Sequence, residues 1–99
     1  MFKNGMRPVH PGEVLREDYL IPLGLTANAL AKALNVPAPR INDIVRERRG
    51  VTADTAMRLA RYFGGDARSW LNLQAAYELR VAEIHNAKRI EREISPAAA

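Results

Sequence analysis

Cysteine is absent from the chain, and groupings of reactive side chains are scarce. Without cysteine, disulfides, cysteine-based zinc sites and thiol nucleophiles are excluded. The two histidines, His10 and His85, lie far apart and show none of the spacings typical of paired metal ligands. Neither a Ser–His–Asp order nor a phosphate-binding glycine loop is visible. We therefore expect no catalytic activity, no metal and no cofactor.

Long apolar runs are also missing. No stretch approaches the roughly 18 apolar residues that a membrane-spanning helix requires. The N-terminal residues lack the apolar segment of a secretory signal peptide. Because the lack of cysteine also fits a reducing compartment, we expect a cytoplasmic protein that is not attached to a membrane.

Positive charge, by contrast, is concentrated in one part of the chain. The net charge is +4 and the pI is about 10.0. Residues 40–68 hold seven arginines against four acidic residues, a local net charge of +3. The planar guanidinium group suits phosphates and guanine edges, so a nucleic acid is the first partner to consider. The alternative is an ordinary, mildly basic surface.

The apolar pattern predicts a small all-α protein with five short helices. Apolar residues recur at spacings of three and four, and the alternation typical of strands is missing. We expect one helical domain over residues 11–94, preceded by an arm, 1–10, and followed by a frayed tail, 95–99. The length fits a single domain at the small end of the usual range.

Capping residues and breakers set the expected helix bounds. The first helix begins at Pro11, and Pro22 and Gly24 are expected to end it. The other four are predicted over residues 27–34, from 38 or 39 to 46 or 47, from 53 to 63, and from 67 onward, with a polar extension over 88–93. Thr26, Thr52 and Asp66 are the predicted N-caps.

The helices at 27–34 and 38–46 have the spacing of a DNA-binding helix-turn-helix. Asn35 tolerates the left-handed backbone that a tight turn requires, and Pro37 prevents helix before it. Ile41 and Ile44 lie on the inner face of the second helix, so its opposite face is left to enter a major groove. The alternative is a plain helical hairpin with a solvated arginine face.

The side chains expected at the DNA have distinct roles. Arg40 can pair with guanine and Asn42 with adenine, while Arg46, Arg48 and Arg49 suit phosphates. Thr26, at the start of the preceding helix, is placed for another phosphate. The complete predicted DNA-binding set is Thr26, Ala38, Pro39, Arg40, Asn42, Asp43, Arg46, Arg48 and Arg49.

The last helix carries two apolar stripes. Trp70, Leu73 and Tyr77 belong to the first stripe, which is expected to pack into the core. The second stripe is harder to bury in so small a domain and is a candidate homodimer interface; it contains Leu71, Ala75, Leu79 and Ala82. A two-fold dimer would present two reading helices to a palindromic site.

Three segments of the chain, covering roughly residues 8–80, are VHPGEVLREDYLIPLGLTANALAKALNVP, RINDIVRERRGVTADTAMRLARYFG and SWLNLQAAYEL. Together they resemble the HigA antitoxin family of lambda-repressor-like helix-turn-helix proteins. The resemblance implies an antitoxin that binds and neutralises a HigB- or RelE-like, ribosome-dependent mRNA endonuclease. It further implies a dimer that binds double-stranded operator DNA and represses its own operon.

One departure from the family concerns the start of the reading helix. Many relatives carry serines there, whereas this chain has Pro37-Ala38-Pro39, so hydroxyl contacts are not carried over. The position of the RIND segment, residues 40–43, is carried over. Two alternatives stay open: an orphan regulator that binds DNA but has no toxin partner, and an interaction module that no longer reads DNA.

Overall fold

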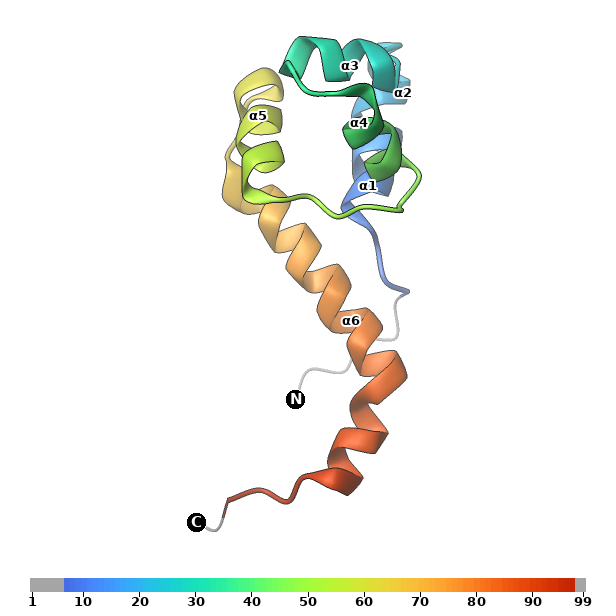
Figure 1. Ribbon diagram of the computed structural model, residues 1–99, viewed down its shortest axis with the longest axis vertical. Coiled ribbons are helices and arrows are strands. Elements are labelled where there is room, and N and C mark those ends of the chain that lie inside the picture. The colour runs from blue at the N-terminus through green and yellow to red at the C-terminus, as the bar shows by residue number, and fades with distance from the viewer. Residues whose placement is uncertain (1–6, 98–99) are drawn as a thin grey trace.

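A computed structural model describes residues 7–97, which are helical from residue 11 to residue 93 apart from short connections (Figure 1). The elements are α1 (Pro11–Val14), η1 (Leu15–Leu20), α2 (Ile21–Leu23), α3 (Ala27–Leu34), α4 (Ala38–Val45), α5 (Ala53–Phe63) and α6 (Ala67–Glu93). The first three run on as one continuous helix, so the predicted all-α, five-helix fold is confirmed for this part of the chain. Residues 1–6 of the predicted arm and 98–99 of the predicted tail lie outside the described residues.

The first helix corrects one expectation, because Pro22 does not end it. Its middle, η1, is a π-helix in which the Ile21 N–H donates to the carbonyl of Arg16. A proline ring normally clashes with the carbonyl four residues earlier. The wider π turn shifts those carbonyls out of α-helical register, so the chain continues past the proline. Gly24, at φ 61°, ends the helix in a left-handed conformation.

The core lies where α1, η1 and α3–α5 meet the first turns of α6. Tyr19 bridges these elements, since its ring lies 4.7 Å from Phe63 and 5.4 Å from Trp70. The buried apolar side chains are Leu15, Leu20, Leu30, Ala31, Leu34, Ile41, Ile44, Val51, Ala56, Leu59 and Trp70. Burial of Ile41 and Ile44 confirms the predicted inner face of α4, which leaves its other face outward.

Helix α6 belongs to the core only over its first half. Trp70 is buried and Leu73 packs against the core, whereas the second half projects from the rest of the molecule (Figure 1). Leu79 and Ile84 are 61% and 53% exposed. The molecule is therefore elongated, measuring 53 × 22 × 21 Å. In residues 7–97 no helix is both long and apolar enough to cross a membrane.

Candidate nucleic-acid interface

The turn between α3 and α4 has the predicted helix-turn-helix geometry. Asn35 adopts φ 58° and ψ 47°, the left-handed conformation. Its N–H donates to the Lys32 carbonyl at 3.1 Å, and the Val36 N–H donates to the Ala31 carbonyl at 3.0 Å. These bonds satisfy carbonyls that would otherwise be unpaired at the end of α3. Ala31 is buried, and its small side chain allows the two helices to pack closely.

The start of α4 is stiffened by its prolines. Pro37 is the N-cap, at φ −61° and ψ 141°, and it makes no side-chain capping bond. Pro39 lies in the first turn, where the missing N–H would have had no partner within the helix. The first backbone hydrogen bond in the first turn of α4 is donated by the Arg40 N–H to the Pro37 carbonyl, at 3.0 Å.

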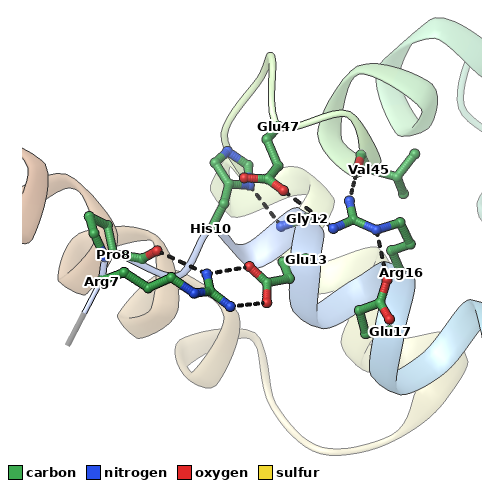
Figure 2. A network of polar contacts seen from close by, with 9 residues as sticks. All are labelled: Arg7, Pro8, His10, Gly12, Glu13, Arg16, Glu17, Val45 and Glu47. Atoms are coloured by element: carbon green, nitrogen blue, oxygen red, sulfur yellow. Dashed lines mark hydrogen bonds and ion pairs between the residues drawn. The ribbon is translucent and has the colours of Figure 1, made fainter.

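The end of α4 is fastened to the first helix by direct backbone contact. A Cβ placed on Gly12 would lie 1.8 Å from the carbonyl oxygen of Ile44, so only glycine permits this approach. Arg16 donates from Nη1 to the Val45 carbonyl and from Nη2 to Glu47 Oε2, the latter at 3.3 Å (Figure 2). Glu47 itself has φ 62°, which turns the chain away from the helix end.

His10 starts the first helix and is almost fully buried. Its Nδ1 accepts a hydrogen bond from the Gly12 N–H at 2.8 Å (Figure 2). Its ring packs against that of Tyr77 in a T-shaped arrangement, with 4.8 Å between the ring centroids. Burial lowers the pKa of this imidazole, and the positive charge of Arg16 lowers it further, while Glu47 acts in the opposite direction. The capping bond requires the unprotonated Nδ1, which is the form that burial favours.

The predicted reading residues are brought together on and beside α4, but most of them have intramolecular partners. Arg40 Nη1 lies 2.6 Å from Asp54 Oδ2 at the start of α5. Asn42 donates from Nδ2 to Asn28 Oδ1 at 2.8 Å and to the Ala38 carbonyl at 3.0 Å. These contacts hold Arg40 on the α5 side of the helix and Asn42 on the α3 side.

The remaining predicted residues differ in exposure. Asp43 pairs with Arg49 at 3.5 Å. The side chains of Arg46 and Arg48 are exposed and form no hydrogen bond or ion pair within residues 7–97, so their guanidinium groups point to solvent. Thr26 caps α3 by accepting from the Ala29 N–H at 3.0 Å. Among the helix-start residues, Pro39 is exposed, whereas Ala38 packs against the core.

A cleft of about 380 Å³ lies next to α4, between the loop at 46–52 and α5. It is lined by Arg40, Arg49, Gly50, Thr52 and Thr55. Gln74 of α6 supports this loop, because its Oε1 accepts from the Val51 N–H at 2.8 Å and its Nε2 donates to Glu78 at 2.7 Å. Two arginines in a shallow opening beside an exposed helix form a surface suited to an anionic backbone.

Several positioning residues escaped the sequence reasoning: His10, Gly12, Arg16, Asp54 and Gln74. The HPG triplet at 10–12 offered a partial signal, since a proline after a polar residue often opens a helix. Arg16, Asp54 and Gln74 contact partners that are far away in the sequence, and the pattern of a single sequence does not reveal such contacts. In residues 7–97 there is no group of three or more acidic or histidine side chains arranged to hold a metal.

The predicted dimer stripe is mostly open. Leu71 packs against the core, whereas Ala75, Leu79 and Ala82 are exposed along α6. Ile84, Ile90 and Ile94, toward and just past the end of α6, are further exposed apolar side chains.

The arrangement as a whole is that of an all-α helix-turn-helix domain with a rigidly seated reading helix. A helix-turn-helix family model matches residues 15–70. Virulence-associated protein I of Dichelobacter nodosus is 69% identical over 81 residues, which is 82% of this chain and 75% of that protein. Antitoxin HigA-1 of Vibrio cholerae is 39% identical over 80% of this chain and 74% of its own length.

A solved structure gives the same result for the fold. The Pseudomonas aeruginosa antitoxin HigA, solved with the higBA promoter, superposes with a TM-score of 0.90 and is 52% identical, covering 93% of this chain and all of that one. The chain therefore belongs to the helix-turn-helix family, in the branch that contains the HigA antitoxins.

Proposed function

We propose that the protein is a DNA-binding antitoxin. In this proposal it binds operator DNA as a dimer, represses its own operon, and neutralises a HigB- or RelE-like mRNA endonuclease. The observation that carries the DNA-binding part is the outward face of α4, with exposed arginines beyond a reading helix fixed at both ends. The likeness to an antitoxin solved with its promoter supports the same reading. The proposal places the protein in the cytoplasm, without catalytic activity of its own.

The proposed roles of the residues in DNA binding follow the exposure of their side chains. Arg40 and Asn42 read base edges, and Arg46 and Arg48 neutralise phosphates. Thr26 and the α3 start bind a further phosphate through the helix dipole. The remaining members of the interface are Ala38, Pro39, Asp43 and Arg49.

The DNA-binding part is tested by fluorescence anisotropy with the duplex upstream of the gene, over a range of salt concentrations. We expect binding to weaken steeply with salt, and the Arg46→Gln, Arg48→Gln double variant to lower the salt slope by about one for each phosphate contact removed. The matched control is Arg61→Gln, Arg68→Gln, which removes the same charge from exposed sites in α5 and α6. Negligible affinity of the unaltered protein at low salt would refute DNA binding.

The dimer is proposed to form through α6, with Ala75, Leu79 and Ala82 at its centre and Leu71 at its edge. Sedimentation at tens of micromolar should give a dimer, which Leu79→Glu should dissociate. Leu23→Glu is the matched control, since Leu23 is 62% exposed and Leu79 is 61% exposed. A monomer for the unaltered chain would contradict this interface.

The antitoxin part is tested by searching for a RelE-like reading frame beside the gene and coexpressing its product with this protein. We expect a stable complex that copurifies, and loss of mRNA cleavage on translating ribosomes when the antitoxin is added. Sequence-specific DNA binding without any such partner would instead establish the orphan regulator.

A further inference from the structure

Asp54, in the first turn of α5, is the meeting point of two arginines from different elements. Its Oδ2 accepts from Arg40 Nη1 of α4 at 2.6 Å and from Arg58 Nε of α5 at 2.9 Å. Arg58 is held in turn, because its Nη1 donates to the Leu34 carbonyl at the end of α3 at 2.9 Å. A single carboxylate oxygen thus joins the reading helix to the two helices that flank it.

The charge of this carboxylate is stabilised by its partners. The hydrogen bond from Arg58 is the largest cause that lowers the pKa of the Asp54 carboxyl, followed by that from Arg40. Asp54 therefore stays negative throughout the neutral range. A negative charge beside a DNA-binding helix repels phosphates, so its presence works against general affinity for DNA. A benefit to DNA recognition would therefore have to come from its effect on Arg40.

That benefit follows from the flexibility of arginine. A guanidinium on a long side chain samples many rotamers, and ordering it upon binding has a cost in entropy. The contact to Asp54 uses one of the five N–H donors of Arg40, and the rest keep their planar arrangement. The Arg40 side chain is 31% exposed and lines the cleft beside α4, so these donors lie at the surface that would meet the duplex.

We propose that Asp54 is a positioning residue that orients the Arg40 guanidinium for recognition of one base pair per half-site. The inference rests on the proposed DNA-binding function. Asp54 increases discrimination between sequences while it decreases affinity for DNA in general. A residue that only stabilised the fold would not separate these two quantities.

The experiment selects binding sites from a library of random duplexes and measures anisotropy on the selected site and its single-base-pair variants. We expect Arg40→Ala to reduce discrimination at one base pair by about 5- to 150-fold. Asp54→Asn should reduce it at the same base pair by about tenfold, without lowering affinity for unselected duplexes. In the Arg40→Ala background, Asp54→Asn should cause no further loss.

Two further variants separate charge and stability from orientation. Asp54→Glu keeps the charge but displaces the carboxylate, so it should lose discrimination like Asp54→Asn. Asp66→Asn is the control for an exposed charge change at a helix start, and it should leave discrimination intact. Thermal unfolding of each variant verifies that the compared proteins are folded.

The outcomes distinguish this inference from the function on which it rests. If the unaltered protein selects no sequence, DNA recognition itself fails. If it selects a site and Asp54→Asn keeps full discrimination there, Asp54 does not orient Arg40. A loss spread evenly over all base pairs and over unselected DNA would likewise overturn the inference, because it would indicate a general effect on the fold or the charge.

Discussion

The two ends of α4 are made rigid in different ways. At its start, Pro37 and Pro39 fix the backbone through their rings, with no capping side chain. At its end, Gly12 and Arg16 of the first helix contact the α4 backbone directly. The proline rings stiffen the backbone without contacts to other elements, so the start of α4 can face a ligand. The end of α4 is held by packing against the first helix, so it is turned inward. The exposed end is thus stiff without being covered.

Gly12→Ala should have the largest effect on stability, because it disrupts the packing at the end of α4. The new methyl group would lie 1.8 Å from the Ile44 carbonyl oxygen, and backbone atoms on both sides must move. We expect a loss of about 3 kcal/mol or more in the free energy of unfolding, measured by urea denaturation. Gly50→Ala is the control, since the three atoms nearest its methyl belong to the end of the Gln74 side chain, and a rotamer change with loss of the Val51 hydrogen bond can relieve the contact without backbone movement. Equal losses for the two variants would refute the special role of the contact.

Arg16→Met should weaken the same end less. The methionine keeps the apolar stem but removes the donors to the Val45 carbonyl and Glu47. Hydrogen bonds from a charged donor of this kind contribute about 1.5–3 kcal/mol, and partial exposure places the expected loss near the lower limit. Arg7→Met removes the exposed pair with Glu13 and a long, exposed hydrogen bond to the Pro8 carbonyl, and it should have a much smaller effect in the same denaturation measurement. A larger effect for Arg7→Met would contradict the assignment.

The packed end should also be sensitive to acid through His10. Because the pKa of this imidazole is lowered from 6.5 in the folded protein, the unfolded chain binds more protons as the pH falls below that value. Stability is therefore fully present above pH 6.5 and is lost progressively as the pH falls toward the folded-state pKa. Unfolding followed from pH 7.5 to pH 5 should show this decline.

Two variants check the origin of that decline. His10→Asn keeps an acceptor for the Gly12 N–H but does not titrate in this range, so its stability should depend less on pH. His85→Gln replaces an exposed histidine and should leave the decline unchanged. An unaltered decline in His10→Asn would assign the acid sensitivity to other groups.

Pro39→Ala should have the smallest effect on stability, because it changes the exposed end. Removing the ring increases the freedom of the unfolded chain, which costs about 0.4–1 kcal/mol, and leaves the packed end intact. Comparing DNA affinity of Pro39→Ala with that of Pro39→Ser separates stiffness from hydroxyl contacts. Tighter binding by the serine variant alone would show that a hydroxyl at this position reaches the duplex.

Local features of the fold could be predicted from sequence, because their causes are local. Thr26, Thr52 and Asp66 are the predicted N-caps, and each accepts the expected bond from the backbone N–H three residues later. The left-handed conformation of Asn35 was predicted from the tolerance of asparagine. Glu47 adopts a similar conformation without such a preference, since its position is set by contacts with another helix.

The partners of the reading residues could not be predicted for a related reason. The face of α4 on which Arg40 and Asn42 lie follows from helical periodicity. Their contacts with Asp54 and Asn28 each join residues 14 positions apart, so they depend on how three helices pack. Which residues of α4 face outward could thus be predicted from the sequence, but the intramolecular contact that restrains each of them could not.

The contact between Arg16 and Val45 also bears on the order in which its two partners are synthesised. The two residues are 29 positions apart, so at a synthesis rate of about 5–20 residues per second the first helix leaves the ribosome about 1.5–6 seconds before the end of α4. A helix forms in about a microsecond. The segment that fastens the end of α4 is therefore synthesised seconds before α4, so in each new chain the two partners emerge in a fixed order.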